Sequence, residues 1–383
     1  MKPQTYDVAV VGAGVFGAWT AYQLHRAGAT VILIDQYGPG NVRASSGGDT
    51  RIMRMGYGPD EVYTRSAQRS IEHWVKLYET SEQQLFHRTG VLWLARDDHD
   101  YCRQTLTTLE KTGGCFEKLT RAELEAAYPQ IEFGPITWGI VEPESGVLMA
   151  RRAVRHLVEL ATSKGVSFLA DSVQSPQKDA ALNSVATVGG KQIKAGTFVF
   201  ACGPWLPKIF PDVLGDLIHV TRQEVFFFGA SPGDQRFSPP AMPVWIDFND
   251  LVYAIPDVEG RGFKIAIDAH GEEFDPDCGD RTGTTKGLEA ARQYLSLRIP
   301  SLTAAPVLES QVCQYENTCN GDFLIDLHPS FANVWLVGGG SGHGFKHGPA
   351  VGEYVAKMIA GEREPESRFT LAAKVKTNSR QVY

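Results

Sequence analysis

The sequence has little of three features that would each assign it to a class of protein: basic charge, long apolar runs and cysteine. Asp and Glu outnumber Lys and Arg by 44 to 37, so the 383 residues carry a formal net charge of −7. This acidity argues against nucleic acid as the main partner, because phosphate binding needs a basic surface. No apolar run reaches the roughly 18 residues of a membrane span. We therefore expect neither nucleic acid nor a membrane as a partner.

Only six cysteines are present, and two of them, Cys313 and Cys319, stand in C-x5-C spacing. That spacing fits neither a C-x-x-C redox pair nor a pair of zinc knuckles, and we predict no metal site. The N-terminal stretch MKPQTYDVAVVGAG passes directly into a glycine-rich turn and lacks a cleavage site typical of a signal peptide. We therefore expect a cytoplasmic protein with reduced thiols. A covalent role for one of the two cysteines would need a partner molecule.

The segment YDVAVVGAGVFGAWTAYQLHRAGATVILIDQ predicts a strand, a helix and a second strand that ends at Asp35. Gly12, Gly14 and Gly17 stand between the first strand and the helix in G-x-G-x-x-G spacing. These glycines permit a tight turn, close approach of a pyrophosphate, and close packing of the helix on the strand. An acid at position 35 can bind a ribose hydroxyl, which favours NAD or FAD over NADP. The alternative is a chance glycine turn in another α/β protein.

Parallel α/β patterns fall at the start, the middle and the end of the chain, and antiparallel patterns fall between them. We predict an α/β fold of two interleaved domains (α+β), in which a Rossmann-like dinucleotide-binding domain alternates with an antiparallel-sheet substrate domain. The predicted dinucleotide-binding parts are 1–86, 148–217 and 305–383, and the substrate parts are 87–147 and 218–304.

Two further segments carry charge beside glycine. The loop SSGGDTRIMRMGYG contains Arg51 and Arg54, whose spacing alone suits a solvated polar loop. The segment GGGSGHGFKHGPAVGE places five glycines between 338 and 344, with Lys346 at the edge. Such a turn lets the backbone press against a flat or anionic ligand at the start of a helix. The alternative, a flexible surface loop, fits poorly between an apolar strand and an amphipathic helix.

Five blocks together carry a family resemblance: VVGAGVFG, GGDTRIMRMGYG, ACGPW, VCQYENT…DFLIDLHP and SGHGFKHGPAVGE. In this order they resemble the D-amino-acid-oxidase-like flavoproteins and, within them, the branch of monomeric sarcosine oxidases and N-methyltryptophan oxidases. The resemblance spans nearly the whole chain and implies that the dinucleotide is FAD.

The resemblance also implies a role for Cys313. In that branch the cysteine of C-x-Y-x-N-T forms a thioether with the flavin 8α-methyl group, and here Tyr315, Asn317 and Thr318 follow in step. A thiolate is a suitable nucleophile for this bond. The resemblance assigns no role to Cys319.

Other roles follow from the resemblance one residue at a time. Arg51 is similar to an arginine that lies against the flavin, and Arg54 and Lys346 are similar to a pair that holds the substrate carboxylate. Lys264 aligns with a lysine that activates O2. The catalytic residues implied are Lys264, Arg54, Lys346, Tyr253, His343 and Asp268. The FAD-binding residues implied are Gly12, Gly14, Val15, Phe16, Gly17, Asp35, Gln36, Ser46, Arg51, Cys202, Gly203, Cys313, Tyr315, Gly340, Gly342, His343, Gly344 and Lys346.

The chain departs from the branch at two places. Asp268 stands where a histidine follows the O2 lysine, and Ser46 and Gly47 replace paired histidines. The first change places an acid where a neutral or cationic ring is expected, so relatives that oxidise pipecolate, N-methyltryptophan or fructosyl amino acids are weighed beside sarcosine oxidases.

We therefore predict an FAD-dependent amine oxidase that acts on a secondary or N-substituted amino acid with a carboxylate. Hydride passes to the flavin, the imine is hydrolysed, and O2 is reduced to H2O2. One alternative is a flavin dehydrogenase of the same fold that uses a quinone or protein acceptor. Another is a non-catalytic flavin-binding or tRNA-modifying protein. We expect a monomer.

Overall fold

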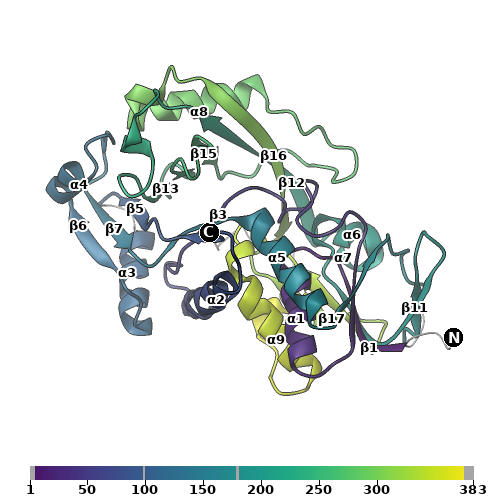
Figure 1. The fold of residues 1–383 in the computed structure, drawn as a ribbon. Helices are drawn as coiled ribbons and strands as arrows, with labels where there is room; N and C mark the ends of the chain where they lie inside the picture. The colour runs from purple at the N-terminus through teal and green to yellow at the C-terminus, as the bar shows by residue number, and fades with distance from the viewer. Residues whose placement is uncertain (1–4, 98–99, 178–180, 375–383) are drawn as a thin grey trace.

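A computed structural model describes residues 5–97, 100–177 and 181–374, and it contains two large sheets (Figure 1). In spatial order the first sheet consists of β17 (Leu324–Leu327), β18 (Val334–Gly338), β11 (Gln192–Phe200), β1 (Thr5–Val11), β2 (Val31–Asp35) and β9 (Ser167–Ala170), with β10 (Ser184–Ala186) paired to β11. The strands from β18 to β9 are parallel, whereas β17 and β10 pair antiparallel at the margins. The order confirms the predicted Rossmann-like sheet.

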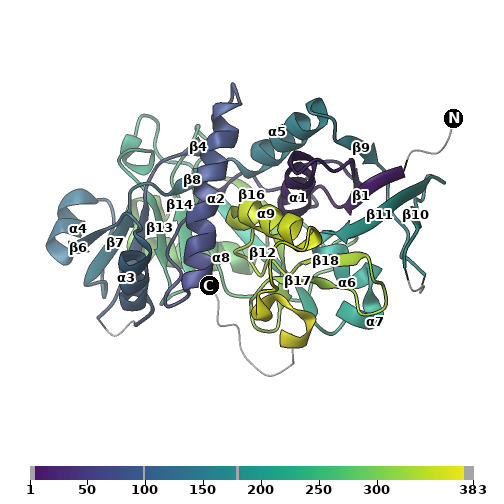
Figure 2. The same cartoon turned by 90° about the horizontal axis from the view of Figure 1, so that it is seen from below.

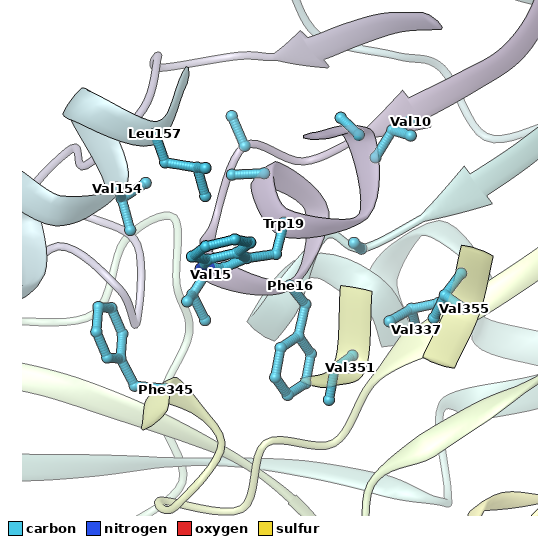
Figure 3. Packing of buried hydrophobic residues seen from close by; sticks show 14 of the residues in the cluster. Val10, Val15, Phe16, Trp19, Val154, Leu157, Val337, Phe345, Val351 and Val355 are labelled. Carbon is cyan, nitrogen blue, oxygen red and sulfur yellow. The ribbon is translucent and has the colours of Figure 1, made fainter. Parts of the chain in front are cut away.

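One face of this sheet is covered by helices. These are α1 (Val15–Arg26), α5 (Ala150–Ser163) and α9 (Gly348–Ile359), and α2 (Glu61–Glu79) packs against α9 (Figure 2). Trp19 of α1 lies between them and is 2% exposed, with Leu157 of α5 and Val351 of α9 in the same apolar cluster (Figure 3). At Gly352 a Cβ would lie 2.6 Å from the backbone carbon of Trp19, so only glycine allows α9 to approach α1 this closely.

The second sheet is mostly antiparallel, as predicted. Its spatial order is β16 (Val307–Thr318), β12 (Ile218–Phe228), β15 (Phe263–Ile267), β14 (Val252–Ile255), β13 (Val244–Asp247), β5 (Val91–Ala95), β7 (Trp138–Glu142) and β6 (Glu117–Thr120). Only β13 and β5 pair parallel among these described strands. Three helices belong to this half of the molecule: α3 (Asp100–Thr112), α4 (Arg121–Ala127) and α8 (Thr285–Arg298). The helix α8 ends before Pro300, where the sequence places a stop.

Shorter elements connect the two halves. A small antiparallel sheet contains β3 (Arg51–Met53), β8 (Gly146–Leu148) and β4 (Phe86–His87). The short helices are α6 (Leu206–Ile209), α7 (Pro211–Leu214), η1 (Gly203–Trp205), η2 (Gln235–Phe237), η3 (Pro300–Leu302), η4 (Phe345–His347), η5 (Ser367–Phe369) and η6 (Leu371–Ala373). Because β3 carries Arg51 and leads to Arg54, this sheet holds one wall of the site.

The two sheets draw their strands from alternating parts of the chain, so the halves are interleaved. The boundaries after 86, 147, 217 and 304 stay a prediction. The strand β16 follows the last of them, yet it pairs with β12 of the second sheet along nearly its whole length. Within the described ranges, no helix has the length and apolar character needed to cross a membrane. The cytoplasmic location and the monomeric state also stay predictions.

Candidate active site

Two cavities meet between the sheets. The first, of about 310 Å³, follows the carboxyl ends of β1, β2 and β11. The second, of about 420 Å³, lies against β14, β15 and β16. Six residues line both, so the boundary between the cavities runs past them: Ala44, Arg51, Cys313, Tyr315, Gly342 and Phe345. A cofactor that extends through the first cavity would therefore present one end to the second.

The turn between β1 and α1 has the backbone geometry that its glycines predict. Gly12 has a φ of +104°, and a Cβ there would lie 2.2 Å from the carbonyl oxygen of Ala201. A Cβ on Gly17 would lie 1.8 Å from the carbonyl oxygen of Gly12, so Gly17 packs beneath the turn. Gly14 lines the first cavity at the start of α1, where helix N–H groups and the helix dipole favour an anion.

Asp35 ends β2 and faces the same cavity. Its Oδ2 accepts a hydrogen bond from Ala13 N at 2.8 Å, and its Oδ1 accepts one from Tyr37 N at 2.9 Å. Burial raises the pKa of this carboxyl group above its usual value. The side chain is thus held in place with acceptor positions available for a ribose hydroxyl. Gln36 lines the cavity beside it.

Ser46, which stands where the branch has a histidine, supports the start of α1. Its Oγ accepts a hydrogen bond from Val15 N at 3.0 Å, and this satisfies one of the free N–H groups of the first helical turn. Like Ser46, six further predicted cofactor residues line the first cavity: Val15, Phe16, Cys202, Gly203, Gly340 and Gly344. Within the described chain, Gly17, His343 and Lys346 do not line it.

Glu316 is a residue of the first cavity that our sequence analysis missed. It is 8% exposed, and its Oε1 accepts a hydrogen bond from Gly340 N at 3.2 Å. Its Oε2 is buried and has no hydrogen-bond partner among the residues that the structure describes. Burial raises the pKa of Glu316 to about 7. Burying a carboxylate costs free energy unless a donor binds it. A glutamate within a buried strand is therefore the one sequence signal that pointed to a ligand here.

The residues of the first cavity fit FAD. The glycine turn and the N-terminus of α1 suit the pyrophosphate, Asp35 suits a ribose, and the orphaned Oε2 of Glu316 needs a hydroxyl donor. FAD carries such hydroxyl groups along its ribityl chain. We therefore assign the first cavity to FAD.

Cys313 is in contact with the predicted flavin arginine. Arg51 Nη2 donates a hydrogen bond to Cys313 Sγ at 3.2 Å, and the same guanidinium donates to the carbonyl oxygens of Ser45 at 2.6 Å and Thr50 at 2.8 Å. These bonds fix the cation beside the sulfur. Cys319 lies beyond the end of β16 and is not among the described residues that line either cavity.

Arg54 and Lys346 line the second cavity and both contact Tyr57. The guanidinium carbon of Arg54 lies 4.2 Å from the centre of the Tyr57 ring, and Lys346 Nζ donates a hydrogen bond to Tyr57 Oη at 2.9 Å. Both cations are buried, at 5% and 6% exposure. Tyr57 also accepts or donates a bond to His347 Nε2 at 2.7 Å. The predicted carboxylate pair is thus brought together by a tyrosine that sequence analysis did not single out.

His343 stands behind this pair. Its Nδ1 lies 3.3 Å from Tyr57 Oη, its Nε2 lies 3.0 Å from the carbonyl oxygen of Gly321, and Lys346 Nζ donates to its backbone oxygen at 3.1 Å. Burial and the adjacent Lys346 hold the pKa of the neighbouring His347 well below its usual value. A neutral His347 adds no positive charge beside Arg54 and Lys346.

Lys264 projects from β15 into the second cavity and is 2% exposed. Its Nζ donates to Thr50 Oγ1 at 3.2 Å and to the Thr50 carbonyl oxygen at 3.3 Å. Burial, followed by the charge of Arg51, lowers the pKa of Lys264 to about 7. This lysine therefore changes its charge near neutral pH.

Tyr253 and Asp268 line the second cavity on either side of Tyr315. Tyr315 Oη donates a hydrogen bond to Asp268 Oδ1 at 2.7 Å. Burial raises the pKa of both tyrosines, so both phenols are protonated near neutral pH.

The orphaned Glu316 yields a prediction about cofactor affinity. In a Cys313→Ala background, Glu316→Ala should weaken FAD binding by about 10- to 100-fold, since a hydrogen bond to a charged group contributes about 1.5–3 kcal/mol. Glu316→Gln keeps an acceptor oxygen and should retain most of the affinity. Titration of apoprotein with FAD, followed by flavin fluorescence, measures the Kd. Equal affinities in Glu316→Ala and the parent would show that Glu316 does not bind the cofactor.

Comparisons with known proteins agree with this geometry. A profile of the FAD dependent oxidoreductase (DAO) family matches residues 7–358. Monomeric sarcosine oxidase from Bacillus sp. (strain B-0618) is 30% identical over 370 residues, which cover 94% of this chain and 93% of that protein. N-methyl-L-tryptophan oxidase from Yersinia pestis (strain Pestoides F) is 28% identical over 376 residues, which cover 96% and 99%.

Solved structures share the fold. L-proline dehydrogenase from P. horikoshii superposes with a TM-score of 0.85 at 22% identity and covers 96% of this chain and 97% of its own. Fructosamine oxidase from Aspergillus fumigatus superposes with a TM-score of 0.81 at 20% identity and covers 96% and 89%. The resemblance found in the sequence is confirmed, and the chain belongs to the DAO family of FAD dependent oxidoreductases, among the relatives of the monomeric sarcosine oxidases.

Proposed function

We propose that this protein oxidises a secondary or N-substituted amino acid to an imine and reduces O2 to H2O2, with FAD as its cofactor. The observation that carries the proposal is the convergence of Arg54 and Lys346 on Tyr57, in the cavity that meets the cofactor cavity at Cys313. Two buried cations in one apolar, aromatic surrounding suit a carboxylate. Sarcosine oxidase and N-methyl-L-tryptophan oxidase, the relatives named above, carry amino-acid substrates in their names.

The chain's own residues would bind and orient the substrate. Arg54 and Lys346 would hold the carboxylate, and Tyr253 and Phe248 would close the cavity around the rest of the molecule. FAD, when bound, supplies the hydride acceptor and the electrons for O2. The protein would contribute positioning and electrostatic stabilisation. Holding two reacting groups in contact removes much of the entropic barrier to their reaction.

Lys264 supports O2 as the acceptor. A buried cation beside the flavin would stabilise negative charge that develops on oxygen. The second candidate is a dehydrogenase that passes electrons to a quinone or protein. The fold is compatible with both, since the solved structures that share it include a dehydrogenase and an oxidase. A non-catalytic flavin protein would have no need for the buried pair of Arg54 and Lys346.

We also propose that FAD is attached through Cys313, because Cys313 Sγ lies at the meeting point of the cavities with Arg51 beside it. Acid-precipitated wild-type protein should stay yellow, and Cys313→Ala should release the flavin into the supernatant. Cys319→Ala is the matched control and should leave the pellet yellow. A colourless pellet from fully loaded wild-type protein would rule out the bond.

Replacement of Lys264 tests the acceptor. Lys264→Met should slow reoxidation of the reduced enzyme by O2 by about 100-fold or more, because removing one preorganised group that stabilises developing charge typically lowers a rate by that factor. Anaerobic reduction by substrate should change much less. In wild type, reoxidation should slow as pH rises through about 7, because the lysine loses its proton there.

The control for this variant is Lys357→Met, whose side chain is 45% exposed on α9. Stopped-flow absorbance separates the two half-reactions. An equal loss in both would assign Lys264 a structural role. Rapid reoxidation by a quinone, with none by O2, would favour the dehydrogenase.

Carboxylate recognition is tested with an N-methyl amino acid and its methyl ester. Wild type should strongly prefer the acid, and Arg54→Ala should lose most of that preference, because removing one partner of a desolvated charge pair costs about 2–5 kcal/mol. Arg151→Ala is the control, since Arg151 lines the same cavity but pairs with Asp49. The measurement is kcat/KM from H2O2 release. Equal turnover of acid and ester by wild type would point to a simple amine substrate.

A further inference from the structure

The carboxylate of Asp268 is held on the wall of the second cavity. Asp268 follows β15, and its backbone N–H donates to the carbonyl oxygen of Leu251 at 2.6 Å. Leu251 has a φ of +52°, a left-handed conformation that closes the turn between β13 and β14. Tyr315 Oη donates to Asp268 Oδ1 at 2.7 Å, which fixes the carboxylate and leaves Oδ2 as an acceptor.

Three acids that the structure describes line this cavity, and Asp268 differs from the other two. Asp247 pairs with Arg298 at 3.3 Å, and Glu309 pairs with Arg261 at 2.6 Å. Asp268 forms no ion pair with any residue of the described ranges. A half-buried carboxylate that faces a cavity without a cationic partner is complementary to a cationic ligand.

The strand β16 places Asp268 near the boundary between the two cavities. Tyr315, which binds Asp268, stands two positions after Cys313, so the two side chains lie on the same face of the strand. Both residues line the boundary between the cavities. A nitrogen bound to Asp268 would therefore lie near this boundary, while Arg54 and Lys346 would hold a carboxylate in the same cavity.

We infer that Asp268 binds the substrate's ammonium group, so that the site selects amino acids in their zwitterionic form. Before oxidation the bound ammonium releases one proton to water, which frees the nitrogen lone pair. This inference rests on the proposed function and adds the charge of the nitrogen to it. The substrate's carboxylate would bind to Arg54 and Lys346, and its ammonium group would bind to Asp268. N-acyl amino acids, whose amide nitrogen carries no charge, would be excluded from this class of substrate.

Two unreactive acids of equal shape isolate the charge. Betaine (trimethylglycine) carries a permanent ammonium group, and 3,3-dimethylbutanoate has a carbon atom in its place. Neither has an amine lone pair that could drive hydride transfer. Each would be titrated into flavin-loaded protein, and binding would be followed by the change in flavin absorbance. Wild type should bind betaine about tenfold more tightly, a value between those of exposed and fully desolvated charge pairs.

Asp268→Asn should reduce this preference to less than about threefold through weaker binding of betaine, and leave the affinity for 3,3-dimethylbutanoate within about twofold. Glu309→Gln removes a charge from the same cavity and should keep the tenfold preference, because Glu309 has its own arginine partner. The comparison in wild type alone decides the case if the Asn variant does not fold.

Equal affinities of wild type for the two acids would overturn the role of Asp268, and so would an unchanged preference in Asp268→Asn. If neither acid binds and no amino acid yields H2O2, the proposed function is overturned as well. Binding of both acids with equal affinity would overturn the ammonium site alone.

Discussion

The pairing of β12 with β16 is the constraint on which the rest of the site depends. The two strands pair antiparallel from Ile218–Thr318 to Phe228–Val307, with one irregularity at the far end. The end of β16 then meets the glycine-rich turn, where Ser341 N donates to the carbonyl oxygen of Glu316 at 3.1 Å. One strand thus presents Cys313 and Tyr315 to both cavities and Glu316 to the first. A slip of one residue would turn these side chains to the opposite faces, so the register of this pair sets the site.

The site that this strand organises is rich in buried charge. Arg54, Lys346 and Lys264 are buried beside one cavity, and Glu316 is buried beside the other. Burial moves the pKa values of Lys264 and Glu316 to about 7, and the charge of Arg51 adds to the shift of Lys264; these shifts are the electrostatic cost of burying such groups. Binding of an anionic substrate and a hydroxyl-bearing cofactor would offset that cost. Affinity and catalytic orientation therefore come from the same groups.

Much of the fold and part of the site could be predicted from the sequence, because the sequence signals for them are local. The spacing of Gly12, Gly14 and Gly17 predicted the turn, the antiparallel patterns predicted the second sheet, and five sequence blocks identified the family. The contacts that assemble the site are not local: Lys346 and Tyr57 are 289 positions apart. No periodic pattern marks such a contact, and the orphaned oxygen of Glu316 becomes visible only once the Gly340 turn is in place.

The central claim is that a carboxylate-bearing amine reduces FAD in this chain and that O2 takes the electrons. The most direct measurement is the flavin absorbance of the loaded protein, recorded anaerobically after addition of N-substituted amino acids and again after admission of O2. We expect the oxidised flavin spectrum to disappear with at least one such acid and to return, with formation of H2O2, after O2 is admitted. A spectrum that stays oxidised with every acid in the series, in protein fully loaded with FAD, would contradict it.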